Sequence, residues 1–385
     1  MRAPALDVDL YADSVLADST DLWARIRDAG PVVWLPRHRL YAMGRYADVR
    51  AALRDDAGYR SGHGVAANPV ANALGRDTTL ASDEDVHVRR RRVLMHELGA
   101  KAIAAIDGPL RREAEDLVDD LTCRRHFETA RDFSSRLPVS VVAELVGVRG
   151  GGERMLEWAA ATFDGLGPAN PRGLRSAPRA LGLLRYSRGL RPSAVARASW
   201  AASVFDAQAR GELSAREARA LIIDFVAPSL DTTILAGTHL LWALGRNPDV
   251  WDRLRADPSL IPAAIVENVR LASPIRGFTR RLGADREVGG VTLPKGARIA
   301  LLFAAANRDE QQFPDPERFD LGRRGGHLGW GNGPHTCVGI HLAKLELRAL
   351  LEALVPRVRE IVVGRPTQLR NNTLQGIAAL PARLR

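Results

Sequence analysis

The stretch "HLGWGNGPHTCVG", residues 327–339, surrounds one of only two cysteines in a 385-residue chain with glycine. Its glycines let the backbone turn tightly and pass close to a flat, bulky group without Cβ atoms in the way. Apolar residues then follow at helical spacing from Ile340 to Leu354. Cys337 is therefore expected just before or on a helix N-terminus, where the helix dipole and unpaired N–H groups favour a thiolate over a thiol.

Several uses of such a cysteine can be compared. A zinc site would need a second ligand pair such as Cys-x-x-Cys, which the chain lacks. A nucleophile would need a base and an oxyanion hole, and His335 is poorly placed as that base. Axial ligation of a haem iron suits the loop best, because freed N–H groups can offset the charge on the sulfur. A buried structural cysteine is the alternative when the motif is taken alone.

Residues 330–339 resemble the cysteine-ligand signature of the cytochrome P450 family, Phe-x-x-Gly-x-x-x-Cys-x-Gly, with Trp330 in place of the usual Phe. The resemblance covers nearly the whole chain and implies haem b, with Cys337 as the iron ligand and Trp330, Gly331 and Gly339 beside the cofactor. It also implies a mainly α fold with small β-sheets, a triangular prism with a long central helix over the haem. Trp330 is expected to change the environment of the sulfur.

One domain is expected over residues 1–385. The helical portion is expected mainly at 80–272 and 338–355. The β-rich portion is expected mainly at 30–60, 275–305 and 357–385. The Pro- and Gly-rich segment 164–178 is expected to be a flexible connection.

The central helix begins with a capping box, Ser214-Ala-Arg-Glu217, and its apolar periodicity continues to Leu244. Pro228 removes a hydrogen bond from its middle and is expected to kink it. Asp231-Thr232 matches the family's acid–alcohol pair, which implies that the hydroxyl supports bound oxygen and that the carboxylate feeds protons through water. An ordinary polar turn on a helix is the alternative.

Haem carries two propionates, which need cationic or hydrogen-bonding partners once enclosed. Residues 83–94, "DEDVHVRRRRVL", resemble the family's His-x-x-x-Arg helix, with His87 and Arg91 one turn apart. The resemblance adds Arg280 and His335 as the other two partners. A solvated helix face is the alternative for the arginine run.

Glu267-Asn-Val-Arg270 resembles the family's Glu-x-x-Arg pair, which locks to a later arginine and holds the ligand loop. Arg318 in "FPDPERF" (313–319) matches that arginine. The pattern alone is weak, because Glu128-Thr-Ala-Arg131 fits it too. Its weight comes from the order of the motifs along the chain.

The resemblance implies an apolar pocket for a hydrophobic small molecule. The residues expected to line it are Val65, Ala66, Leu230, Ile275, Arg276, Phe278 and Leu374. Arg276 is the one charged residue in this set. It could pair with a carboxylate on the substrate, reach a haem propionate or face solvent.

The formal charge of +10 raises the question of an acidic partner. Only three of the 55 basic residues are lysines, and the arginines are spread along the chain, so nucleic-acid binding is not expected. The family implies electrons from NAD(P)H through a ferredoxin or flavodoxin-type protein. The residues expected to form a basic face for it are Arg89, Arg90, Arg92, Lys344 and Arg348.

Two cysteines make no disulfide framework, and the opening "MRAPALDVDLYADS" lacks the apolar run of a signal peptide. A cytoplasmic protein without a membrane span is therefore expected. The leading hypothesis is a haem-thiolate monooxygenase that hydroxylates, O-dealkylates or epoxidises its substrate with O2 and two electrons. The same scaffold performing oxidative coupling, desaturation or peroxide-driven oxidation is the alternative. A non-catalytic haem sensor or carrier is the alternative from another class.

Overall fold

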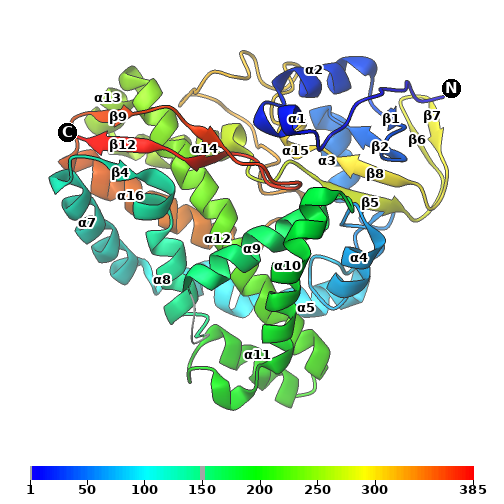
Figure 1. Ribbon diagram of the computed structural model, residues 1–385, viewed down its shortest axis with the longest axis horizontal. Coiled ribbons are helices and arrows are strands. Elements are labelled where there is room, and N and C mark those ends of the chain that lie inside the picture. Colours follow the sequence, from blue (N-terminus) through cyan, green and yellow to red (C-terminus); the bar gives the residue numbers. More distant parts are fainter. Residues whose placement is uncertain (1, 148–151) are drawn as a thin grey trace.

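The computed structural model describes residues 2–147 and 152–385. Figure 1 shows a wedge that is broad at the top and narrows towards α11 (Trp200–Ala209). Helices form most of the wedge, and the strands lie mainly along its broad end. The prediction of a mainly helical fold with small sheets is confirmed.

The central helix α12 (Ala215–Arg246) runs through the middle of the molecule and packs against α9 (Gly152–Leu166), α14 (Ile261–Ala272) and α16 (Ile340–Arg357). Its capping box is present as predicted. The Ser214 hydroxyl accepts the Glu217 N–H, and the Glu217 carboxylate accepts the Ser214 N–H. The helix continues through Pro228 to Arg246.

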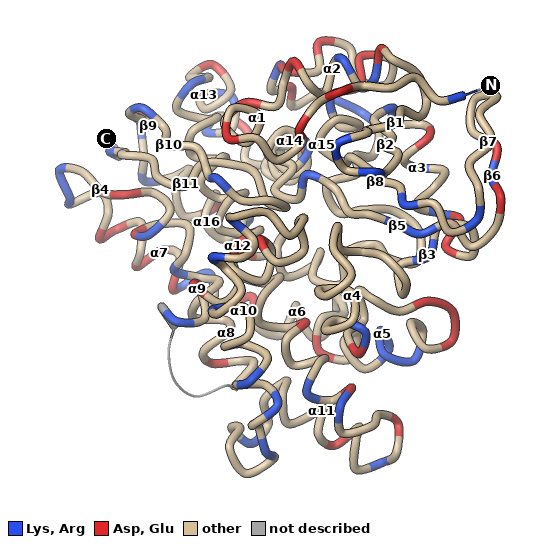
Figure 2. The backbone as a smooth tube through the Cα atoms, turned by 45° about the vertical axis from the view of Figure 1, so that its right-hand side comes forward, with Lys and Arg blue, Asp and Glu red and all other residues tan. Residues whose placement is uncertain are grey.

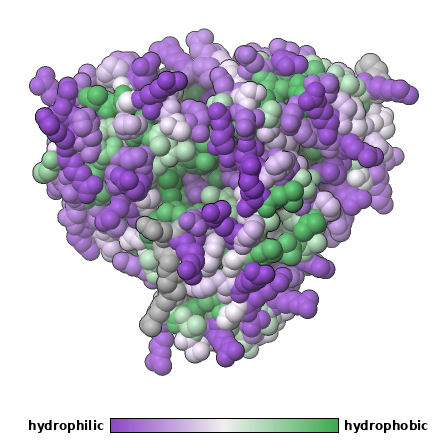
Figure 3. Space-filling view, in the orientation of Figure 1, coloured by the Kyte–Doolittle hydropathy of each residue, from purple (hydrophilic) through white to green (hydrophobic). Residues whose placement is uncertain are grey.

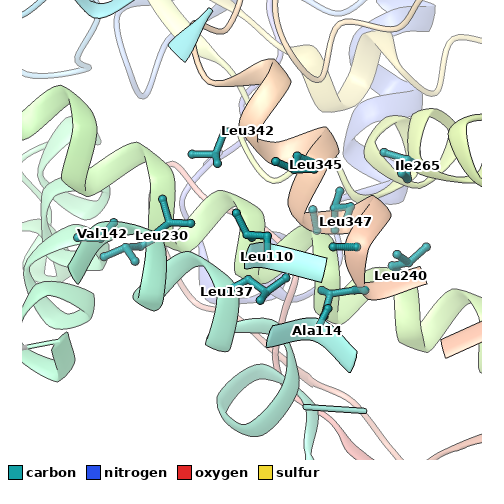
Figure 4. Close-up of a cluster of buried hydrophobic side chains, with 14 of the residues drawn as sticks. Leu110, Ala114, Leu137, Val142, Leu230, Leu240, Ile265, Leu342, Leu345 and Leu347 are labelled. Carbon is teal, nitrogen blue, oxygen red and sulfur yellow. The ribbon is translucent and has the colours of Figure 1, made fainter. Parts of the chain in front are cut away.

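The largest hydrophobic cluster surrounds α12. It joins Leu240 of that helix to Leu110 of α7 (Asp107–Cys123), Leu137 of α8 (Arg136–Glu144) and Leu347 of α16 (Figure 4). Burying each such leucine stabilises the fold by about 1.5–3 kcal/mol. Among the described residues, only α12 is long and apolar enough by length and composition to cross a membrane, and much of it lies inside this core.

The main sheet ties the N-terminal segment to residues 278–301. Its strand order is β1 (Val33–Leu35), β2 (Leu40–Met43), β8 (Arg298–Leu301), β5 (Phe278–Leu282) and β3 (Tyr59–Arg60). Only the β2–β8 pair is parallel, with Ala42 opposite Ala300. Strand β5 thereby carries Arg280 from the sheet towards the centre of the molecule.

Smaller sheets close the molecule at its edges. Strand β12 (Pro381–Leu384) lies between β4 (Phe127–Glu128) and β9 (Ile361–Val363). Two hairpin-like pairs are β6 (Arg286–Val288) with β7 (Val291–Leu293), and β10 (Thr367–Gln368) with β11 (Ile377–Ala379).

Further α-helices cover the remaining faces. They are α1 (Asp13–Ala17), α2 (Thr20–Ala29), α3 (Tyr46–Arg54), α4 (Pro69–Gly75), α5 (Glu84–Leu98), α6 (Ala100–Ala104), α10 (Pro171–Gly189), α13 (Pro248–Ala256) and α15 (Phe303–Ala306). The prediction of a flexible connection at 164–178 is wrong, because α9 extends to Leu166 and α10 begins at Pro171. The Asn170 side chain caps α10 by accepting the Gly173 N–H, and Pro171 occupies its first turn.

Candidate active site

A cavity lies between α12 and the cysteine loop. Helix α12 contributes Asp224, Pro228, Ser229, Thr232, Thr233 and Ala236 to its lining. The loop contributes residues 329–331 and 335–339, and α5 contributes His87, Arg91, Leu94 and Leu98. Segments separated by more than two hundred residues in the sequence therefore enclose one space.

The cysteine loop is held by its own backbone. The Cys337 N–H donates to the Trp330 carbonyl at 2.8 Å, and α16 begins at Ile340 as predicted. Gly331 and Gly333 have φ of 69° and 71°, a region that favours glycine, and a Cβ at Gly333 would clash with the Leu53 carbonyl. A Cβ on Gly339 would meet nothing within 4 Å, and Gly339 lines the cavity. The loop therefore leaves open space beside the sulfur for a flat ligand.

Burial governs the charge of the sulfur. It raises the pKa of the Cys337 thiol above its ordinary value, although the Gly339 N–H and the charge of Arg91 act in the opposite direction. The N–H donor at the start of α16 therefore favours the thiolate as expected, but burial outweighs it while no cation is bound. A metal cation bound to the sulfur would favour the thiolate over the thiol despite burial, because a coordinating thiol is deprotonated.

Four nitrogen-bearing side chains line the same cavity: His87, Arg91, Arg280 and His335. The rings of His87 and His335 lie 4.0 Å apart, and the Nε2 atom of each is buried without a hydrogen-bond partner in the described structure. Burial lowers the pKa of Arg280 to about 10, and no carboxylate of the described residues pairs with it. Buried donors and cations without partners are costly, so this group fits an anionic ligand such as the two propionates of haem.

The acid–alcohol pair lies on α12 across the cavity from the loop. Thr232 lines the cavity, and its hydroxyl donates to the Pro228 carbonyl at 2.8 Å. The Oδ2 atom of Asp231 is buried without a hydrogen-bond partner, and burial raises the pKa of this carboxyl to about 7. A carboxyl in this state can hold or release a proton near neutral pH.

A buried charge network supports the loop from behind. Arg270 donates two hydrogen bonds to Glu267, both 2.8 Å long, and also donates to the Asn307 carbonyl at 2.7 Å. The Asn307 side chain in turn accepts the Leu328 N–H at 2.7 Å. Asn307, which was not predicted from the sequence, therefore connects the Glu-x-x-Arg pair to the cysteine loop.

The prediction of Arg318 as the third member of this network is wrong. Arg323 fills that place, donating from Nε to Glu267 at 2.9 Å. Arg318 contributes only its carbonyl, which accepts from Arg270 at 3.3 Å, and its side chain is exposed. The second match to the pattern is no such pair, because Arg131 binds Asp132.

Comparisons with known proteins place this geometry in a family. The model described as Cytochrome P450 matches residues 191–381. Cytochrome p450 CYP199A2 of Rhodopseudomonas palustris is 32% identical over 99% of this chain and 94% of its own length. The chain belongs to the cytochrome P450 family. As a P450 it is a haem-iron monooxygenase.

One further sequence relative and two solved structures are similar to this P450 over nearly its whole length. Linalool 8-monooxygenase of Pseudomonas putida is 29% identical, with 99% of this chain and 98% of that protein covered. The solved structure of epothilone D-bound Cytochrome P450epoK superposes with a TM-score of 0.85 at 24% identity, covering 99% of each chain. P450BioI, solved with a ligated acyl carrier protein, gives a TM-score of 0.87 at 21% identity, covering 97% of this chain and 100% of that one.

The structure corrects part of the predicted substrate lining of this P450. Ile275 and Phe278 line the cavity as predicted. Leu230 does not, because it lies on the opposite face of α12 and packs in the core beside Leu137 and Val142 (Figure 4). Phe163 of α9, which was not predicted, lines the cavity instead.

The remaining predicted lining residues also lie elsewhere. Arg276 is buried with its guanidinium 5.1 Å from the Trp23 ring and its Nη2 3.4 Å from the Ser19 hydroxyl, so the prediction that it lines this cavity is wrong. Val65 lines a separate small cavity with Arg276. Ala66 is tied through its backbone to Asn72. Leu374 packs behind the cavity with Phe163.

The predicted basic face of this P450 is only partly free. The prediction that Arg90 faces outward is wrong, because Arg90 is buried and donates to Glu217 at 3.0 Å. Arg89 also binds Glu217, and Arg348 pairs with Asp107. Arg92 is 70% exposed, and the Lys344 ammonium lies 4.9 Å from the Trp330 ring centre. Figure 2 shows basic and acidic residues interspersed over the chain as a whole.

Replacing Arg323 tests the corrected network. Arg323→Ala leaves a buried carboxylate one charged donor short, so the free energy of unfolding of the holoprotein should fall by about 1.5–3 kcal/mol. Urea denaturation followed by circular dichroism and by haem absorbance measures this. The matched control Arg318→Ala should change it by less than about 0.5 kcal/mol. A larger loss in the control than in Arg323→Ala would contradict the assignment.

Proposed function

We propose that this P450 inserts one atom of O2 into a hydrophobic small organic molecule and reduces the other to water, using two electrons from a redox partner and two protons. One observation carries the proposal: Cys337 and Thr232 line opposite sides of one cavity. Haem b, when bound there, supplies the redox and oxygen chemistry. Hydroxylation is the simplest outcome, and O-dealkylation or epoxidation follows from the same insertion on other substrates.

The chain's own residues divide the work of holding the cofactor. Cys337 would bind the iron, and the donors His87, Arg91, Arg280 and His335 would neutralise the propionates. Glu267, Arg270 and Arg323 keep the cysteine loop in position through Asn307. This division leaves α12 free to face the substrate.

Proton delivery is assigned to Asp231 and Thr232. Thr232 lines the cavity, and its hydroxyl donates to the Pro228 carbonyl. The hydroxyl can rotate away from this carbonyl to donate to another acceptor in the cavity. Asp231 holds a proton in a substantial fraction of molecules at neutral pH, since burial raises its pKa to about 7. Asp231 does not line the cavity, so we assign it to recharging Thr232 through water.

A hydrophobic substrate suits the rest of the cavity. Its lining is rich in apolar side chains, among them Leu80, Phe163, Ile275, Phe278 and Phe303. On the surface, Figure 3 shows apolar side chains gathered near α4 and α10. The large apolar side chains exposed on these two helices are Val70, Leu74, Leu174 and Leu181. This patch suits the capture of apolar molecules from water.

An acidic ferredoxin or flavodoxin-type electron donor, which receives its electrons from NAD(P)H, would dock behind the cysteine loop. A surface hollow between α6, α14 and α16 has an apolar floor that includes Ile103 and Ile265 and a rim with His341, Lys344 and Arg348. Lys344 belongs to this rim and also contacts Trp330 beside the cysteine. The proposal places the protein in the cytoplasm, where such donors are reduced.

Thr232→Val tests the assigned proton delivery while keeping the side-chain shape. With a compound that shifts the haem spin state, NAD(P)H and O2 consumption should continue, but product formed per O2 consumed should fall roughly tenfold or more. Thr233→Val is the control, because Thr233 also lines the cavity. Full coupling in Thr232→Val would remove the hydroxyl from the mechanism, and absence of product from the wild type would favour a sensor or carrier.

The donor site is tested with two of the three lysines. Lys344→Gln should raise the KM for an acidic ferredoxin several-fold and flatten the loss of turnover with added salt. Lys295→Gln is the control, since Lys295 lies in the β7–β8 turn away from the hollow. Steady-state kinetics at several ionic strengths measure both. Equal effects of the two substitutions would show that net charge alone attracts the donor.

A further inference from the structure

One ionisable side chain in the cavity has no part in the proposed function. The titratable residues of the lining are His87, Arg91, Asp224, Arg280, His335 and Cys337. Five of these are assigned to the haem. Asp224 is left over, and among the described residues it is the only carboxylate in the lining of this cavity.

Asp224 lies at the far end of the cavity from the chemistry. It shares one face of α12 with Pro228 and Thr232, at spacings of four and eight residues. Eight residues of helix correspond to about 12 Å along the axis. A substrate of that length could therefore reach Asp224 with one end while its other end lies beside Thr232.

The carboxylate of Asp224 is only partly satisfied by the protein. Its Oδ2 atom accepts the Thr79 N–H at 2.7 Å, the Thr79 hydroxyl also lies close enough to stabilise its charge, and no described basic residue forms an ion pair with it. The charge of Arg90 lowers its pKa, but the Arg90 guanidinium already donates to Glu217 and to the Arg76 and Thr78 carbonyls. An ionised carboxylate accepts at both oxygens, so hydrogen-bonding capacity remains for a ligand.

A carboxylate in an apolar cavity carries a desolvation cost that a cation would offset. Burial raises the pKa of Asp224 to about 6, while the N–H and the hydroxyl of Thr79 and the charge of Arg90 lower it, so the ionised form prevails at pH 7.5. A carboxylate ligand would meet repulsion at this end of the cavity. A neutral apolar ligand would leave the charge uncompensated.

We infer that Asp224 binds a positively charged nitrogen of the substrate, so that the substrate class is an amphiphile with an ammonium group at one end and an apolar skeleton reaching Thr232. The inference rests on the proposed function, because it takes the cavity to be the substrate site. It assigns Asp224 as the residue that decides which end of such a molecule is oxidised.

The test compares three ligands with the same ten-carbon chain: decyltrimethylammonium, decanol and decanoate. A quaternary nitrogen has no lone pair and cannot ligate the iron, so the ammonium compound binds only through its contacts with the cavity. Dissociation constants come from spin-state titrations of the haem-loaded protein at pH 7.5. The wild type should bind the ammonium compound at least about tenfold more tightly than decanol, and decanoate most weakly.

Asp224→Asn removes the charge but keeps an oxygen that accepts the Thr79 N–H. It should weaken decyltrimethylammonium about tenfold or more and change decanol less than about twofold. Asp224→Ser repeats the test if the amide variant does not fold. Asp77→Asn is the matched control, because Asp77 lies near Arg90 but does not line this cavity. It should leave all three affinities unchanged.

Equal affinity of Asp224→Asn and wild type for the ammonium compound would overturn the inference. An equal loss of affinity for all three ligands would also overturn it, because it would mean that Asp224 only fastens the Thr79 segment to α12. The carbon monoxide spectrum of the reduced protein, recorded on the same samples, separates this failure from a failure of the proposed function. A thiolate-type spectrum with no effect of Asp224→Asn would reject the inference alone.

Discussion

The buried sulfur of Cys337 is the constraint around which the rest of the structure is arranged. Burial disfavours its charge, so a thiolate is stable there only with a cation on the sulfur and N–H donors around it. Trp330 fixes the loop through its carbonyl, and Gly339 leaves the space beside the sulfur open. The site therefore fits a metal-bearing, anionic ligand, since the nearby Nε2 atoms of His87 and His335 also lack partners in the described structure.

Two buried glutamates join the elements on the two sides of the cavity to their neighbours. Glu267 binds Arg270 and Arg323 behind the cysteine loop, and Glu217 binds Arg89 and Arg90 at the start of α12. Each carboxylate has a lowered pKa despite burial, because two arginines donate to it. Removing one partner from such a network costs far more than an exposed ion pair is worth. Arg90 also holds the 76–78 backbone, which brings the Thr79 segment to Asp224.

Short sequence motifs predicted where the central helix begins and how the cysteine loop turns. They did not predict which way individual side chains point, because that depends on residues far away in the sequence. The capping box at Ser214 and the glycines of the cysteine loop act within a few residues, and both features are present. Arg323 replaces Arg318 because the turn after Asp320 decides which guanidinium reaches Glu267. Arg90 is buried because Glu217, 127 residues away, lies opposite it. The Pro and Gly content of segment 164–178 predicts a flexible connection, but a helix begins within it. Asn170-Pro171 is the signal for the start of that helix.

The central claim is that Cys337 binds the haem iron as a thiolate. The most direct measurement is the absorption spectrum of the reduced, haem-loaded protein with carbon monoxide, recorded for the wild type and for Cys337→His. The wild type should show the red-shifted Soret band of thiolate ligation, and Cys337→His should show the shorter-wavelength band of imidazole ligation. A shorter-wavelength band in freshly prepared, folded wild type, unchanged by the substitution, would contradict the claim.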